Sequence, residues 1–270
     1  MAVVPCCLTI AGSDSGGNAG VQADLRTFHA YGLHGCSVLA ALTAQNPFGV
    51  TAIHAVPADF VAAQLDAVLG VYAIRTLKTG MLADPDAINA LAARLAKHPD
   101  IAKVVDPVMV ATSGARLVSE EAMDAIVSNL LPLATLMTPN LPEAEVLCGE
   151  TMRPQEQRRG DVARAADLAR ELAHRFRCAV LVKGGHGENA EAVDVLCESP
   201  DAPVETFARA WVRNPVSTHG TGCTLSAALA AELALGASLR EAVRGAKDYV
   251  HRVIEHGFLV GERCGVLGFR

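Results

Sequence analysis

The feature that most constrains the fold is a repeated alternation of short apolar segments with amphipathic helical patterns. Buried strands are predicted at residues 3–11, 36–45, 74–80, 103–109, 134–140, 179–185, 192–198 and 205–212. Between them, three segments place apolar side chains three and four residues apart, as one face of a helix does: residues 57–70, 161–176 and 239–254. Strand–helix–strand repetition favours right-handed crossovers and a mostly parallel sheet.

The composition supports a sheet that is covered on both faces. The 270 residues are 51% hydrophobic but only 4% aromatic, so Ala, Val and Leu dominate the predicted core. Such a core suits parallel strands between two layers of helices. We therefore expect an α/β protein of three-layer α/β/α architecture. Because no linker rich in Pro, Gly or Ser interrupts the chain, residues 1–270 are interpreted as a single domain, with 149–160 as a polar surface loop.

Charge and cysteine usage exclude several classes of function. The net charge is −6 and no basic run occurs, which argues against nucleic acid or a membrane surface as a partner. The apolar segment 1–12 lacks a basic start and a cleavage site, so it is interpreted as a first strand. No apolar run reaches the ~18 residues of a membrane span. The eight cysteines show no Cys/His metal spacing, which is typical of buried thiols in a reducing cytoplasm.

Two polar positions near the first two strands are candidate substrate contacts. Open parallel sheets bind ligands beyond the carboxyl ends of their strands, and the glycine-rich segment 11–20 follows the first strand without matching the Rossmann or P-loop pattern. Asp24 and Gln45 could together recognise an amine-bearing heteroaromatic ring. Asp24 could equally be an exposed acid in a helix's first turn. The segment around Gln45 could equally be an ordinary turn signalled by Asn46-Pro47.

Four residues after later strands suggest a cation and phosphate site. Asp106 ends an apolar strand, Asn140 and Glu143 stand one helical turn apart, and Lys183 ends another strand. Carboxylates in such positions hold Mg²⁺ beside phosphates, and the lysine could offset phosphate charge. Each has a structural alternative. Asp106 could form an Asp-Pro turn, Asn140 and Glu143 could form a capping box, and Lys183 could be a solvated lysine at a strand end.

The segment "GTGC" places backbone amides and a thiol at the start of a helix. The amides of residues 220–223 can hold the developing charge of a transferring phosphoryl group. The helix dipole is expected to lower the pKa of Cys223 and to make it a proton acceptor near neutral pH. Two alternatives stay open: a nucleophilic cysteine, which needs a base such as His219, and a small residue that helps the helix to pack.

Seven motifs in order resemble one enzyme family. The segments "LTIAGSDSGGNAGVQADLRTF", "CSVLAALTAQN", "KTGML", "DPVMVATSG", "TPNLPEAEVL", "LVKGGH" and "STHGTGCTLSAALA" are similar to those of the bacterial hydroxymethylpyrimidine/phosphomethylpyrimidine kinases. The resemblance spans about residues 6–258. It implies a ribokinase-like fold and a kinase of thiamin synthesis that uses ATP and Mg²⁺. Its substrates would be 4-amino-5-hydroxymethyl-2-methylpyrimidine and then the monophosphate of that compound.

The resemblance also implies roles for individual residues. The pyrimidine would be recognised by Asp24 and Gln45, in a pocket lined by Gly12 and Met81. Asp106, Asn140 and Glu143 would lie near Mg²⁺ and the phosphates, with Lys183 on the phosphates of ATP. Gly220, Thr221 and Gly222 would form the anion hole, and Cys223 would replace the aspartate base of most ribokinase-like enzymes. A homodimer is common among such relatives.

Two positions depart from the family pattern. Thr112 stands where the family usually has a lysine, which removes a positive charge near the second, phosphorylated substrate. Asn18 replaces a frequent glycine, and Asn tolerates a left-handed backbone better than most residues. The rival interpretations are a pyridoxine or pyridoxal kinase of the same fold, a non-catalytic pyrimidine-binding protein, and a cysteine-dependent hydrolase.

Overall fold

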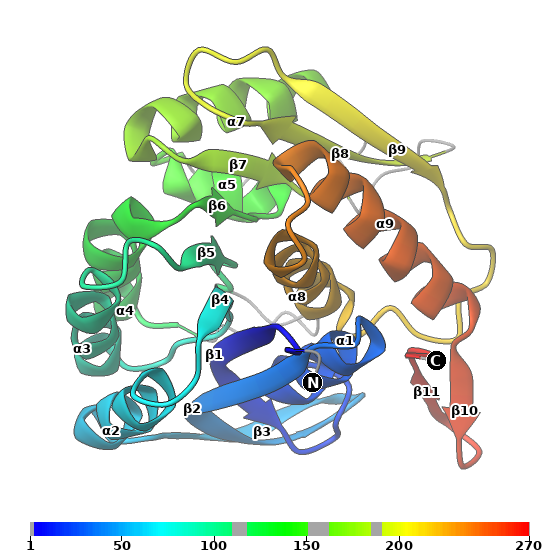
Figure 1. The fold of residues 1–270 in the computed structure, drawn as a ribbon. Coiled ribbons are helices and arrows are strands. Elements are labelled where there is room, and N and C mark those ends of the chain that lie inside the picture. Colours follow the sequence, from blue (N-terminus) through cyan, green and yellow to red (C-terminus); the bar gives the residue numbers. More distant parts are fainter. Residues whose placement is uncertain (1–2, 110–117, 151–161, 185–190, 270) are drawn as a thin grey trace.

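A nine-stranded sheet forms the centre of the molecule (Figure 1). The computed structural model describes residues 3–109, 118–150, 162–184 and 191–269. The strand order is β3-β2-β1-β4-β5-β6-β7-β8-β9. The strands are β1 (Cys6–Asp14), β2 (His34–Asn46), β3 (Gly49–Ala55), β4 (Ile74–Thr79), β5 (Ala102–Val105), β6 (Leu136–Met137), β7 (Ala179–Val182), β8 (Glu191–Cys197) and β9 (Glu205–Ala210).

The middle of the sheet is parallel and its edges are antiparallel. Strands β2, β1, β4, β5, β6 and β7 pair in parallel. At one edge β3 pairs antiparallel with β2, and at the other β8 and β9 pair antiparallel with β7 and with each other. The predicted mostly parallel sheet is confirmed. The turn predicted at Asn46-Pro47 joins the two strands of a hairpin. The sequence pattern did not predict the second of these strands, β3, because the residues of β3 are largely exposed.

Helices cover both faces of the sheet and produce two apolar cores. One face carries α1 (Gly20–Ala30), α8 (Thr221–Ala234) and α9 (Leu239–Glu255). The other carries α2 (Ala58–Leu69), α3 (Pro85–Leu95), α4 (Glu120–Ala125), α5 (Leu141–Leu147) and α7 (Val162–Phe176). The expected three-layer architecture is therefore present (Figure 1). A small antiparallel pair, β10 (Phe258–Val260) and β11 (Cys264–Val266), follows α9.

The alternation of side chains along β1 shows how the two cores are separated. Cys6, Leu8 and Ile10 belong to the core beneath α2 and α3, whereas Cys7 belongs to the core beneath α8 and α9. Successive residues of a strand point to opposite faces, so an apolar run buries both sides. In α2, the apolar pattern of residues 57–70 places Phe60, Val61 and Leu65 on one side of the helix, but only Val61 and Leu65 are buried and Phe60 is 61% exposed.

The parallel strands of the sheet bring their carboxyl ends to one edge of the molecule. Asp14 ends β1, and Asp106 directly follows β5. Asn140 follows β6, and Lys183 directly follows β7. Polar side chains that are far apart in sequence therefore gather at one end of the sheet. Among the described helices, none combines the length and the apolar character that a membrane span requires.

Candidate active site

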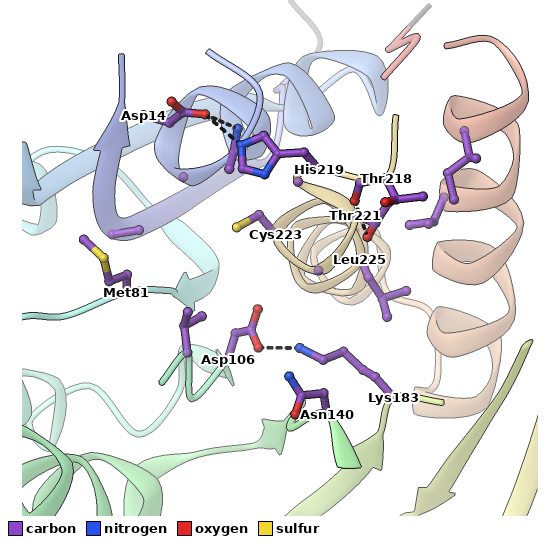
Figure 2. A pocket seen from close by; sticks show the side chains of 18 of the residues that line it. Asp14, Met81, Asp106, Asn140, Lys183, Thr218, His219, Thr221, Cys223 and Leu225 are labelled. Atoms are coloured by element: carbon purple, nitrogen blue, oxygen red, sulfur yellow. Dashed lines mark hydrogen bonds and ion pairs between the residues drawn. The ribbon is translucent and has the colours of Figure 1, made fainter. Parts of the chain in front are cut away.

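A cavity of about 390 Å³ lies at the carboxyl ends of the strands, beside the start of α8 (Figure 2). All but one of the site residues expected from the sequence line it. They are Gly12, Gln45, Met81, Asp106, Asn140, Glu143, Lys183, Gly220, Thr221, Gly222 and Cys223. The exception is Asp24. Thr112 lies outside the described residues, so its place relative to the cavity is not assigned.

The start of α8 depends on a glycine. Gly220 caps the helix with φ +91°, in the left-handed region. A Cβ at this position would lie 1.9 Å from the backbone oxygen of Asn18, so only glycine fits. The backbone N–H and hydroxyl of Thr224 both donate to the Gly220 oxygen, at 2.9 and 2.8 Å. The first-turn amides have no acceptor within the helix, and they lie at the cavity wall.

An ammonium group faces this helix start across the cavity. Lys183 Nζ donates to Asp106 Oδ1 at 2.7 Å (Figure 2). A Cβ built on Gly222 would lie 3.8 Å from the same Nζ, so Lys183 and the glycine turn converge. The hydroxyl of Ser226 donates to Asp106 Oδ2 at 3.2 Å. Burial alone would lower the pKa of Lys183, but Asp106 and Glu143 raise it by more, and the ammonium stays charged.

Asn140 and Glu143 form the capping box that was the structural alternative, and both also line the cavity. Asn140 Oδ1 accepts from the Glu143 N–H at 2.9 Å, and Glu143 Oε2 accepts from the Asn140 N–H at 2.7 Å. The Glu143 carboxylate lies 4.0 Å from Lys183 Nζ. Burial and the Asp106 charge raise the pKa of Glu143 to about 7, against the opposing effect of Lys183. The two interpretations are compatible, because capping fixes the side chains at the cavity rim.

The electrostatics of Cys223 differ from the expectation. The residue lies at the start of α8, beside the cavity, and is half-buried. Burial raises the pKa of the thiol, and the charges of Asp24 and Asp106 add to the rise. Lys78 and the backbone N–H of Gly20 oppose it without reversing it. The pKa of Cys223 is therefore raised and not lowered as expected, with the loss of hydration as the largest cause.

The opposite end of the cavity joins an apolar wall to an amide. A Cβ on Gly12 would lie 2.5 Å from Met81 Cε, so the glycine leaves the space that the methionine occupies. Gln45 Oε1 accepts from the Thr43 hydroxyl at 3.1 Å, and Gln45 Nε2 lies 3.3 Å from His219 Nε2. These contacts involve both polar atoms of the amide, which lies at the cavity wall.

Asp14 and His219 belong to the same cluster; the sequence reasoning did not select Asp14 and considered His219 only as a base for a nucleophilic Cys223. His219 Nε2 lies 3.5 Å from Asp14 Oδ2 (Figure 2). The carboxylate also accepts from the N–H groups of Gly16, Asn18 and Ala19, at 2.8–2.9 Å. Burial would raise the pKa of Asp14, but these hydrogen bonds and the one from His219 lower it. Its strand-end position was the available signal, since Asp106 was selected on the same ground.

Asp24 lies beneath the cavity floor, which corrects the expectation that it contacts the substrate. Its side chain is fully buried and accepts from Lys78 Nζ at 2.9 and 3.0 Å and from the Thr9 hydroxyl at 2.6 Å. It stands on the inner face of α1, so it is not an exposed first-turn acid either. Burial lowers the pKa of Lys78, but Asp24, Cys223 and Asp106 together raise it by more. Lys78, which the sequence reasoning did not select, lines the cavity.

A third part of the lining comes from α8, α9 and the segment after β9. Leu225, Val250 and Ile254 present aliphatic side chains there. Lys247 and Asp194 form an ion pair of 2.6 Å at the same wall. The cavity therefore combines an aliphatic wall, a cationic and amide-rich centre, and a polar end near Gln45.

The fold is shared with solved structures of vitamin kinases. The ADP complex of Bacillus subtilis pyridoxal kinase superposes with a TM-score of 0.86 at 32% identity, covering 99% of this chain and 98% of that one. Phosphomethylpyrimidine kinase from Clostridium difficile 630 gives 0.77 at 37% identity, covering 91% and 97%. The chain is therefore a ribokinase-like kinase.

The sequence comparisons identify the family within this class. The model of the phosphomethylpyrimidine kinase family matches residues 14–268. The hydroxymethylpyrimidine/phosphomethylpyrimidine kinase of Rhizobium meliloti (strain 1021) is 48% identical over 248 residues, which cover 92% of this chain and 89% of that protein. The chain belongs to the phosphomethylpyrimidine kinase family, as the seven motifs predict.

The buried Asp24–Lys78 pair predicts a large loss of stability when one partner is removed. Lys78→Met leaves a carboxylate buried without its counter-charge, and the free energy of unfolding should fall by about 3–5 kcal/mol. Urea denaturation followed by circular dichroism measures this. The double variant Asp24→Leu/Lys78→Met should recover part of the loss. The exposed pair Arg94–Asp66 is the control, and Arg94→Met should cost under about 1 kcal/mol. Equal losses of stability for Lys78→Met and Arg94→Met would contradict the interpretation that Asp24–Lys78 is a buried, mutually dependent pair.

The two glycines at the start of α8 should respond differently to alanine. Gly220→Ala combines a left-handed backbone with a backbone clash, so the free energy of unfolding should fall by at least about 1–3 kcal/mol. Gly222→Ala has ordinary contact distances and should stay within about 1 kcal/mol of wild type. Its methyl group would stand between the helix amides and Lys183, so kcat should fall on the order of 10–100-fold. Denaturation and steady-state kinetics test the pair, and full activity of Gly222→Ala would refute the phosphate site.

Proposed function

We propose that this chain is the ATP-dependent kinase of thiamin synthesis that acts on 4-amino-5-hydroxymethyl-2-methylpyrimidine. It phosphorylates the hydroxymethyl oxygen and then converts the monophosphate to the diphosphate. Membership of the phosphomethylpyrimidine kinase family supports this function. The observation that carries it is the convergence of Lys183 and the glycine turn of α8 in one cavity, facing the Gln45 amide and the Met81 wall.

The pyrimidine is proposed to bind between Gln45, Gly12 and Met81. An amide offers one donor and one acceptor side, which matches an aminopyrimidine edge that also has both. Met81 offers a flexible apolar surface for a ring face. The contact of Gln45 with His219 restricts the amide, because His219 is itself held against Asp14. Asp24 acts only indirectly in this proposal, by holding Lys78 at the cavity floor.

ATP is proposed to bind along α8 and α9. The aliphatic wall of Leu225, Val250 and Ile254 suits a purine base, and Lys183 lines the same cavity. The amides of Thr221, Gly222 and Cys223 then surround the transferring phosphoryl group. Phosphoryl transfer depends mainly on positioning and charge stabilisation, and these groups supply both.

Mg²⁺ is proposed to be held by Asp106 and Glu143, directly or through water. Oxygen donors are what this ion prefers. Burial is the main cause of the raised pKa of Glu143, with the Asp106 charge adding to it, and a divalent cation bound beside the two carboxylates would favour their ionised forms. When bound, the ion would neutralise phosphate charge. Asn140 contributes by fixing the Glu143 side chain through the capping box.

Cys223 is proposed to accept the proton of the hydroxymethyl group. Because the pKa of this thiol is raised, little of it is ionised at neutral pH. Proton transfer must therefore come late, when bonding to phosphorus has made the hydroxyl group of the substrate more acidic. In a loose transition state the base is not needed early. We further propose a cytoplasmic location, since ATP is available there and the reducing environment suits eight cysteines that are all unbridged.

Direct product analysis tests the function. The protein with ATP and Mg²⁺ should convert hydroxymethylpyrimidine to its monophosphate and diphosphate, and mass spectrometry separates the two. The monophosphate and pyridoxal should be run beside it, with Lys183→Met as the variant expected to lose most activity. Pyridoxal phosphate as the sole product would transfer the assignment to a vitamin B6 kinase. Absence of any product would favour a binding protein.

Replacing Cys223 tests its role. Cys223→Ser keeps the size and the backbone amide but has a hydroxyl that is a far weaker acid. Its kcat should fall by about 10²–10⁴-fold, while the KM for the pyrimidine changes little. Steady-state kinetics with both substrates measures the split.

A second cysteine provides the matched control. Cys264 is also half-buried but lies in β11, away from the cavity lining. Cys264→Ser should keep wild-type kinetics. An unchanged kcat for Cys223→Ser would show that residue 223 contributes only its backbone N–H.

A further inference from the structure

A second cluster of ligating side chains lies at the other end of the sheet. Cys6, His34 and Cys36 place their sulfur and ring nitrogen atoms within 4.8 Å of one another. It is the one such Cys/His/Asp/Glu group among the described residues. Cys6 begins β1, whereas Asp14 at the far end of that strand lines the cavity. Eight residues of strand separate them by roughly 26 Å.

The register of two parallel strands creates the cluster. Cys6 of β1 is aligned with His34 of β2, and Leu8 is aligned with Cys36 (Figure 1 shows the two strands side by side). His34 and Cys36 are two residues apart, so they point to the same face of the sheet. Cys7 points to the opposite face, where its thiol approaches the Ala230 oxygen. The ligands thus lie at the amino ends of two paired strands and not in a loop.

We propose that Cys6, His34 and Cys36 form a binding site for a thiophilic divalent cation, Zn²⁺, with a water molecule as its fourth ligand. Two sulfurs bound at about 2.3 Å to a tetrahedral zinc stand about 3.8 Å apart. The observed Sγ–Sγ distance is 3.6 Å, so the sulfurs need almost no rearrangement. A disulfide, by contrast, requires about 2.05 Å and a much closer approach.

The surroundings suit an open three-ligand site. Cys6 and Cys36 are 6% and 8% exposed, whereas His34 is at the surface, so the cation has a route from solvent. The His34 ring stacks on Tyr72 with centroids 5.3 Å apart and planes 17° from parallel, which holds the imidazole in place. Zinc displaces the thiol protons on binding, and its own charge then stabilises the thiolates.

Metal titration tests the site in the full-length protein. The reduced protein, stripped with a chelator, is titrated with Zn²⁺ against a chromophoric competitor, and Co²⁺ is used as a spectroscopic probe. We expect one equivalent of high-affinity Zn²⁺ and a cobalt–thiolate charge-transfer band. Cys6→Ser and Cys36→Ser should abolish the band. His34→Gln, at the surface, should fold normally and bind at least about 10-fold more weakly.

Two controls separate this site from other thiols and from the cavity. Cys7→Ser, one residue away on the opposite face, should keep the affinity and the band. Cys223→Ser should also keep them, which excludes the cavity thiol as the ligand. His34→Gln should keep the kinase activity of the wild-type protein. The metal titration does not depend on that activity, so failure of the proposed function would not affect this test.

Three outcomes would overturn the proposal. One is the lack of a high-affinity equivalent in the wild-type protein. Another is a charge-transfer band that survives in Cys6→Ser and Cys36→Ser. The third is formation of a Cys6–Cys36 disulfide in place of metal binding, seen as a loss of two mass units under non-reducing conditions.

Discussion

The close approach of Gly220 to Asn18 is the contact on which the cavity depends. The backbone of the loop after β1 lies so near the start of α8 that a single added carbon would stand 1.9 Å from the Asn18 oxygen. Asp14 fixes the same loop through three backbone N–H groups. Segments two hundred residues apart are thereby joined, and the amides of α8 are aimed at the point where the strands end.

Charge is distributed around this contact in pairs that serve different purposes. Asp24–Lys78 is fully buried and places a permanent cation beneath Cys223, while Lys183–Asp106 lies at the cavity and is open to ligands. A buried pair costs desolvation and is costly to break, so it is a poor source of stability but a reliable way to fix a charge. The raised pKa of Cys223 shows that even this nearby cation does not offset burial. The site therefore orients its thiol more than it ionises it.

The fold was largely predictable because strand and helix periodicity is visible in the local sequence. Polar residues at strand ends, such as Asp106 and Lys183, were predictable for the same reason. Asn140 and Glu143 could be read in two ways: the structure contains the capping box and places both residues at the cavity, and their role toward a cation stays a prediction. Asp24 was misplaced because sequence does not tell which face of a helix meets a buried lysine 54 residues away. The side-chain cluster of Asp14 and His219 and the exposed strand β3 required tertiary contacts to become visible.

The same reasoning explains why the cysteine spacing concealed the second cluster. Metal motifs are recognised when ligands lie a few residues apart on one turn, whereas Cys6 and Cys36 are brought together only by the register of β1 with β2. The two strands keep one alignment from Cys6–His34 to Ala11–Leu39, and a register shift at Ala11/Gly12 then sets the paired ends near Asp14 and Thr43. A cation bound at the amino end would clamp these two strands. It would act on the cavity only through a rigid sheet, and for that reason binding there should leave catalysis unchanged while it stabilises the fold.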